Sequence, residues 1–379
     1  MPLSYPKTRS SGAIVGPTPL FCNEMQLIQS QQADGGVGCG PGGPPHKASK
    51  LSSFGITQWH SAFSPPNFAV IGLLALLAIG CNRDHKKVIA VIPKGNSDLF
   101  WQSVHAGAVK AARENNVDVV WDGPATETDY GVQLQKVDAM LSRRVDAIAL
   151  APIDRQALVS VVNRAADRKV PVIIFDSGID TDRFVAQVAT DNYKAGQIAA
   201  ERMGKVLDGK GTVVIVAVKP GAASTEAREK GFEDIIHQKF PAIRILDKRY
   251  GMALVSQSLL VTENMLTAHP DLDGIFSSNE STTIGAAQAL RSRPRKVKLV
   301  GFDWSPTLLD DLQSGLVDSL VIQDPFQMGY QAVLRAVKHL QGQAVTRITD
   351  LAPRLIDREN QNDAAIQLQL HPDLQKYLE

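Results

Sequence analysis

Two stretches, VPVIIFD at residues 170–176 and VKLVGFD at residues 297–303, decide the fold of this chain. Both are short and largely apolar, which is typical of strands that are buried on both faces in a parallel sheet covered by helices. Each ends on Phe-Asp, and the two aspartates, Asp176 and Asp303, are offset by 127 residues. Asp146 and Asp273, at predicted turns, share that offset. The chain therefore holds two copies of one βαβ unit.

Strand-like runs and amphipathic helical patterns alternate on both sides of these stretches. The expected strands are 88–92, 117–121, 147–150 and 170–175 in the first copy, and 213–218, 243–246, 274–277 and 297–302 in the second. Regular alternation of strand and helix predicts an α/β fold, here with two doubly wound parallel-sheet lobes.

The last part of the pattern is shared between the lobes. A strand-like run at 320–323 precedes a helix at 327–340, and a final strand is expected near 351–356. These crossings predict a multi-strand hinge. We expect lobe 1 at 86–190 plus 324–351, lobe 2 at 191–323 plus 352–366, and a C-terminal tail at 367–379.

Composition excludes several classes of protein. The 379 residues suffice for about two domains of ~150 residues. With 40 Lys plus Arg against 39 Asp plus Glu, the net charge of +1 gives no electrostatic footprint for nucleic acid or an anionic membrane. Three Cys exclude a disulfide scaffold or a Cys-rich zinc module. We find no GxSxG, HExxH or P-loop and no His pair at metal-ligand spacing, so we expect no enzyme, no metal and no cofactor.

The first 81 residues have a separate character. Residues 1–66 are rich in Gly and Pro, and we expect them to be disordered or not translated. The run FAVIGLLALLAI at 68–79 rises only about 18 Å as a helix, short of a ~30 Å membrane core, so 67–81 is interpreted as an export signal. A small residue before Cys81 resembles a bacterial lipoprotein signal, although Ala78 and the missing basic segment depart from it. That resemblance implies lipidation at Cys81 and location in the periplasm or at the outer face of the cytoplasmic membrane.

Polar side chains follow the predicted strands at the end where open α/β sheets bind ligands. They are one lysine, carboxylates, amides and a guanidinium, together with two aromatics: Lys94, Asn96, Asp98, Phe100, Trp101, Asp154 and Asp176, then Arg228, Asn279, Asp303 and Gln323. Carboxylates and Arg can hold vicinal hydroxyls with two bonds, and amides supply one donor and one acceptor each. The pattern therefore favours a polyol site.

Each of these residues also has a structural alternative. An Asp after a parallel strand is often the N-cap of the next helix, although Ser305 or Thr307 could cap in place of Asp303. Adjacent helical residues do not share a face, so one of Phe100 and Trp101 can belong to the core. Arg228 could pair with Glu229 or Glu233 on a solvated face.

In this order, six segments resemble the periplasmic sugar-binding proteins of ABC importers, of the ribose-binding type, which share their fold with the effector domain of LacI-type repressors. They are FWQSVHAGA at 100–108, ATDNYKAG at 189–196, AREKGF at 227–232, LTAHPDLDGIFSSNE at 266–280, LVGFD at 299–303 and QDPFQMGY at 323–330. The resemblance covers about residues 86–360. It implies the type I periplasmic binding protein fold, and a monomer that binds a monosaccharide and delivers it to an ABC permease with ATPase subunits. It implies no nucleic-acid partner, and contact with the membrane only through the lipid anchor.

The resemblance also implies roles for nine residues. Phe100 and Trp101 resemble the aromatic pair around the sugar ring. The polar contacts carried over from the family are Asp98, Asp176, Asn192, Arg228, Asn279, Asp303 and Gln323. Departures at Ser177, Ala151 and residues 250–252 make ribose itself doubtful and favour a deoxy or larger sugar.

Two other roles remain open on the same fold. A sensor would present the closed form to a chemoreceptor or histidine kinase instead of a permease. A LacI-type regulator needs a basic helix-turn-helix module of about 60 residues, which the Gly- and Pro-rich residues 1–66 do not provide.

Overall fold

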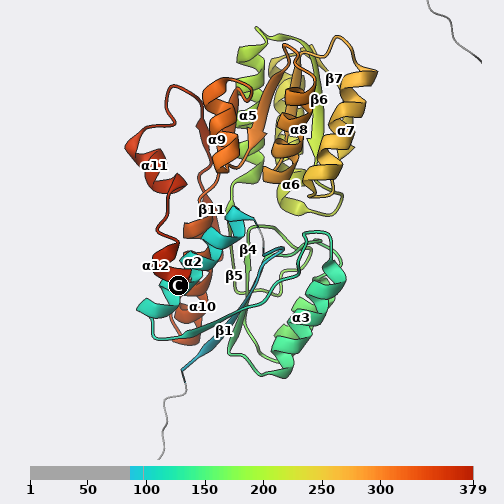
Figure 1. Cartoon of the computed structure of the whole chain (residues 1–379). Helices are drawn as coiled ribbons and strands as arrows, with labels where there is room; N and C mark the ends of the chain where they lie inside the picture. Colours follow the sequence, from blue (N-terminus) through green and yellow to red (C-terminus); the bar gives the residue numbers. More distant parts are fainter. Residues whose placement is uncertain (1–85, 97, 379) are drawn as a thin grey trace, which may run out of the picture. The chain divides into compact units, whose positions relative to one another are not determined.

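The computed structural model describes residues 86–96 and 98–378 (Figure 1). The predicted export signal at 67–81, Cys81 and the segment 1–66 lie outside these residues. Within the described residues, no helix combines the length and apolarity needed to cross a membrane.

The described strands form two six-stranded sheets, as the repeat predicts. The first, in the order β11-β5-β4-β3-β1-β2, is parallel throughout and consists of β1 (Val88–Ile92), β2 (Asp118–Trp121), β3 (Ala147–Leu150), β4 (Val172–Phe175), β5 (Ala186–Thr190) and β11 (Ile348–Leu351). The second, in the order β12-β10-β9-β8-β6-β7, consists of β6 (Lys210–Ala217), β7 (Ala242–Tyr250), β8 (Gly274–Ser277), β9 (Lys298–Phe302), β10 (Ser319–Ile322) and β12 (Arg354–Ile356). Only β12 runs antiparallel to its neighbour in this second described sheet. The predicted class of two doubly wound parallel-sheet lobes is confirmed.

The final strand differs from the prediction. Residues 351–356 do not form one strand, because β11 ends at Leu351 and β12 begins at Arg354 after Pro353. Proline has no N–H to donate to a ladder, so a strand breaks there. The two pieces pair with different sheets, and the chain crosses between the sheets at this point.

Helices cover both faces of each sheet. They are α2 (Leu99–Glu114), α3 (Tyr130–Ser142), α4 (Val159–Asp167), α5 (Asn192–Val206), α6 (Ala223–Lys239), α7 (Val255–Ala268), α8 (Glu280–Ser292), α9 (Pro306–Ser314) and α10 (Pro325–Leu340). Alternate residues of β1 face opposite sides: Ile89 and Val91 join a core with α2 and α10, whereas Ala90 and Ile92 join a core with α3 and α4. This two-sided burial explains why the strand reads as a continuous apolar run.

Equivalent turns hold the first strand of each lobe. The backbone N–H of Val88 donates to Oδ2 of Asp146 at 2.9 Å, and that of Thr212 donates to Oδ2 of Asp273 at 2.8 Å. The pair of aspartates that first indicated a repeat therefore performs one structural task twice.

Each lobe also contains a helix crossing at which two backbones touch. A Cβ on Gly107 of α2 would lie 1.9 Å from the carbonyl oxygen of Phe326, at the start of α10. A Cβ on Gly196 of α5 would lie 1.9 Å from the carbonyl oxygen of Arg228 on α6. Only glycine allows so close an approach. The second crossing fixes the helix that carries Arg228.

Residues 364–378, which include the predicted C-terminal tail from residue 367 onward, pack against both lobes. Helix α11 (Ala364–Leu370) buries Ile366 and Leu370 in the core of the second lobe. Helix α12 (Gln375–Leu378) lies on α2, where the guanidinium of Arg113 donates to the carbonyl oxygens of Lys376 at 2.7 Å and Tyr377 at 3.1 Å. The end of the chain therefore adds a further connection between the lobes.

Candidate functional site

A cavity with about 360 Å³ of empty space, part of it open to solvent, lies where the strands of both sheets end. Thirteen side chains line it: Lys94, Asp98, Phe100, Trp101, Glu127, Asp176, Ser224, Thr225, Arg228, Asn279, Glu280, Asp303 and Gln323. Eight of the nine residues predicted from the family are among them, and the ninth, Asn192, accepts a hydrogen bond from Nε of Arg228 at 2.7 Å.

Asp176 and Asp303 occupy the same position in the two lobes. They follow β4 and β9, and both have left-handed backbones, with φ of 61° and 63°. This conformation is uncommon outside glycine and costs on the order of 1–3 kcal/mol, so it persists where surrounding contacts enforce it. Each backbone N–H bonds the strand next to it, at Val188 and Val321. The strained turns aim both carboxylates into the cavity that they line.

Asp303 is not the N-cap of the next helix, as the structural alternative had it, whereas Asn279 does cap a helix. Ser305 caps α9 by accepting from the N–H of Leu308, which leaves Asp303 to the cavity. Asn279 caps α8 through a hydrogen bond from the N–H of Thr282 at 3.0 Å, in a reciprocal capping box. Its amide therefore holds the helix start that directs the next residue, Glu280, toward the cavity.

Arg228 is buried among polar partners from several elements. Its side chain is 2% exposed, its Nη1 donates to the carbonyl oxygen of Ser278 at 2.9 Å, and its guanidinium lies 3.9 Å from the ring centre of Phe302. Nη1 also lies 3.9 Å from Oδ2 of Asp303. The alternative of a surface ion pair with Glu229 or Glu233 is therefore wrong.

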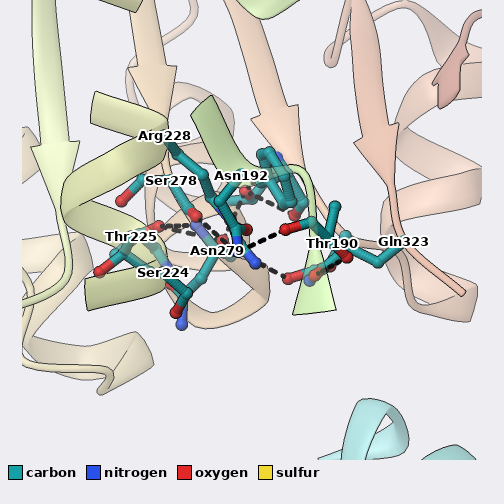
Figure 2. Close-up of polar contacts among 12 residues, drawn as sticks. Thr190, Asn192, Ser224, Thr225, Arg228, Ser278, Asn279 and Gln323 are labelled. Carbon is teal, nitrogen blue, oxygen red and sulfur yellow. Dashed lines mark hydrogen bonds and ion pairs between the residues drawn. The ribbon is translucent and has the colours of Figure 1, made fainter. Parts of the chain in front are cut away.

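A chain of hydrogen bonds connects this arginine to the hinge (Figure 2). Nε of Arg228 donates to Oδ1 of Asn192, and Nδ2 of Asn192 donates to the carbonyl oxygen of Thr190 at 3.0 Å. The hydroxyl of Thr190, at the end of β5, donates to Oε1 of Gln323 at 2.7 Å. The amide of Gln323 in turn donates to Oδ1 of Asp303 at 2.7 Å. Thr190 belongs to the first sheet and Gln323 follows the last parallel strand of the second. The carboxylate in the second lobe is thus oriented by residues at the crossing points.

The two lobes also meet around the cavity. Nζ of Lys94, just after β1, lies 2.6 Å from Oδ2 of Asp176 and donates to the hydroxyl of Ser224 on α6 at 3.1 Å. The backbone N–H of Ser224 in turn donates to the hydroxyl of Ser177 at 3.0 Å. The contacts of Ser224 with Lys94 and Ser177 join opposite lobes, so the structure is that of a closed form.

The aromatic pair divides between core and cavity wall. Trp101 is 2% exposed, packs in the core beneath α2 with Phe175, and donates from Nε1 to Oε1 of Glu127 at 2.7 Å. Phe100 is only partly buried, and its ring meets that of Trp101 at 86° with centres 4.9 Å apart. The two rings border the cavity but do not form parallel walls.

Sequence reasoning missed four of the lining residues: Glu127, Ser224, Thr225 and Glu280. It placed Lys94 among the polar side chains after the strands but not among the nine residues carried over from the family. Lys94 and Glu280 had a usable signal, because the first follows β1 and the second follows Asn279. Burial raises the pKa of Glu280 to about 9 and that of Glu127 to about 7, and nearby carboxylates add to both shifts. Burial also raises the pKa of Asp303.

Raising the pH from 5 to 9 is expected to lower the free energy of unfolding of the ligand-free protein. Above pH 4.5 the unfolded chain has lost a proton that Glu280 still holds in the folded state up to about pH 9. The folded state then binds more protons, so stability falls as the pH rises through this window. Urea denaturation of the wild type and of Glu280→Gln at both pH values measures the difference. If both proteins lost the same free energy of unfolding between these pH values, Glu280 would not be the source of the effect.

Three comparisons place this geometry among known proteins. Residues 89–344 match a family model described as a periplasmic binding protein domain. The chain is 28% identical over 248 residues to a ribose import binding protein of Bacillus subtilis, covering 65% of this chain and 80% of that one. It is 29% identical over 286 residues to a D-ribose/D-allose-binding protein of Pseudomonas aeruginosa, covering 73% and 89%.

Solved structures agree with the fold. A carbohydrate transporter solute-binding protein of Agrobacterium radiobacter, in complex with D-arabinose, is 32% identical with a TM-score of 0.74 over 76% of this chain and 99% of that one. An ABC transporter solute-binding protein of Agrobacterium vitis with bound D-fucose is 32% identical, with a TM-score of 0.73 over 75% and 100%.

Proposed function

Because the chain belongs to the family of periplasmic binding protein domains, we propose that it is the extracytoplasmic solute-binding component of an ABC importer and binds a monosaccharide between its two lobes. One observation carries the proposal: carboxylates, amides and a guanidinium from both lobes converge on one cavity at the ends of the two sheets. Membership of this family agrees with the prediction that the chain is not an enzyme.

The lobes provide the mechanism of delivery. A sugar that contacts Asp176 in one lobe and Asp303 in the other gains its full set of contacts only when the lobes are closed, so binding shifts the population toward the closed form. A change from 1:99 to 99:1 requires a difference of ~5.5 kcal/mol in binding free energy. The permease then recognises the paired lobe faces, and its ATPase subunits supply the energy for transport.

The chain differs from ribose binders at two positions that the family uses for polar sugar contacts. Ser177 stands where ribose binders carry an arginine, and its hydroxyl accepts the interlobe hydrogen bond from Ser224. Ala151 stands where they carry an asparagine, and its carbonyl oxygen accepts from the buried amide of Gln133 at 2.7 Å. The hydroxyl of Ser177 is thus used within the protein, and the methyl side chain of Ala151 offers no hydrogen bond to a ligand. The loss of two polar side chains favours a deoxy or larger sugar.

The proposal places the protein in the periplasm or at the outer face of the cytoplasmic membrane, as a monomer held there by lipid on Cys81. One chain supplies the carboxylates of both lobes, so the site needs no second copy. Globomycin treatment of expressing cells, followed by measurement of the protein's mass, tests the lipid anchor. The uncleaved export signal is expected to stay on the protein. Cleavage of the signal under globomycin, with no lipid on Cys81, would contradict the anchor.

Calorimetric titration with pentoses, hexoses and deoxyhexoses tests the function. At least one sugar is expected to bind with a dissociation constant in the micromolar range or below, and to change the fluorescence of Trp101, whose indole bonds a cavity carboxyl. Trp101→Phe controls for the other tryptophans. Flat titrations across the whole panel would contradict a monosaccharide ligand.

A further inference from the structure

The cavity holds more carboxyl groups than cations. Among its described lining residues the acids are Asp98, Glu127, Asp176, Glu280 and Asp303, whereas the cations are Lys94 and Arg228. A neutral polyol needs acceptors and donors in its site but supplies no charge to balance such an excess. The excess negative charge must therefore be balanced by a cationic group of the ligand or removed by protonation of carboxylates.

Both cations are already engaged within the protein. Lys94 lies 2.6 Å from Asp176 and donates to Ser224. Arg228 faces Asp303 and donates to Ser278 and Asn192. The positive charge of the site is thus assigned to the two carboxylates at the strand ends.

Glu127 and Glu280 have no cation in ion-pair contact, although Lys94 is close enough to oppose the rise in the pKa of Glu127. Across the described part of the chain, neither forms an ion pair within 4.0 Å. Glu127 accepts from the indole of Trp101, and Glu280 accepts from the backbone N–H of Phe100. The other oxygen of Glu280, Oε2, is buried and has no hydrogen-bond partner among the residues that the structure describes. Buried polar atoms are normally bonded, so this oxygen is available to a ligand.

We propose that the cavity binds a monosaccharide-sized polyol that carries a protonated amine, an inference that rests on the proposed function. Glu280, with Glu127, binds the ammonium group. An ammonium supplies three N–H donors and the missing charge, and charge-assisted hydrogen bonds are about twice as strong as neutral ones. A hydroxyl in the same place would supply one donor and no charge. A buried carboxylate at Glu280 is therefore stabilised by an amine but not by a hydroxyl, so the site selects the amine over its parent sugar.

Proton release accompanies such binding. Burial raises the pKa of Glu280, and three acids, Asp303, Asp98 and Glu127, add to that shift. Lys94 and Arg228 line the same cavity. An ammonium beside Glu280 favours its ionised form, so the protein loses a proton at pH 7 when the amine binds. A neutral sugar leaves that proton in place.

The test is calorimetry on matched ligands: 2-, 3- and 6-amino-deoxy hexoses, their parent hexoses and their N-acetyl derivatives, in two buffers of different ionisation enthalpy. At least one amine is expected to bind more than tenfold tighter than its parent and its N-acetyl form, with proton release. Glu280→Gln and Glu127→Gln keep the side-chain shape. Glu280→Gln is expected to weaken binding of the amine by a much larger factor than binding of the parent sugar, so that most of the preference is lost. Glu201→Gln, on the exposed surface of α5, is the matched control.

The possible results distinguish a failure of the amine proposal from a failure of the sugar-binding function. Neutral sugars that bind as well as every amine, or an equal effect of Glu280→Gln on amine and parent, overturn the amine while the sugar-binding function stands. If no member of any set binds, both the function and this inference fail. Circular dichroism of each variant shows that the comparison is between folded proteins.

Discussion

Asp303→Ala is expected to weaken binding of the cognate sugar more than tenfold. The carboxylate lines the cavity in the second lobe, accepts from Gln323 and faces Arg228. Its removal deletes a contact to the sugar hydroxyls and leaves a buried guanidinium without its counter-charge. Breaking one partner of a buried pair typically costs about 3–5 kcal/mol, and the loss falls mainly on the closed, bound state that the pair organises.

Calorimetry on the variant measures this effect, and Asp310→Ala on α9 is the control. Asp310 lies in the same lobe but is exposed. Chemical denaturation of both variants separates loss of affinity from loss of folding. A folded Asp303→Ala protein with wild-type affinity would mean that the sugar does not occupy this cavity.

Gly196→Ala is expected to destabilise the protein by about 3 kcal/mol, at the upper end for overpacking. The new Cβ would lie 1.9 Å from the carbonyl oxygen of Arg228, so the backbone of α5 or α6 must move. Because the displaced residue is Arg228 itself, sugar affinity falls together with stability. No flexible side-chain end is available there to give way.

Gly131→Ala provides the matched control in helix α3. The nearest atom to a Cβ there is Oδ1 of Asp129 at 3.7 Å, an ordinary contact. Alanine in a helix is favoured over glycine, so this variant is expected to be as stable as the wild type or more stable, by up to about 1 kcal/mol. Urea midpoints that fall equally in both variants would contradict the close-packed crossing.

The fold was predictable because buried parallel strands leave a strong apolar signal. Runs such as VIIF and LVGF are apolar on both faces because helices cover both sides of the sheet. Strand β5, AQVAT, was missed since its polar residues interrupt the run, although Ala186 and Val188 are buried in it. The last strand was predicted as one because the pattern spans Pro353, whose missing N–H divides it between two sheets.

The candidate site was predictable only where a residue follows a strand directly. Asp176 and Asp303 end apolar runs, so their position at the sheet edge follows from topology. Glu127 comes from the long connection after β2, and only the indole of Trp101 shows where its carboxyl lies. The secondary-structure propensities of the residues do not predict the path of this connection. The excess of acid in the cavity became visible only when both lobes were seen together.

A crystal structure of the protein with the tightest-binding sugar of the panel tests the central claim most directly. The account predicts that one ring lies in the cavity, with hydroxyl oxygens within hydrogen-bond distance of both Asp176 and Asp303. A sugar bound to one lobe alone, or at any site outside the cavity, would contradict it.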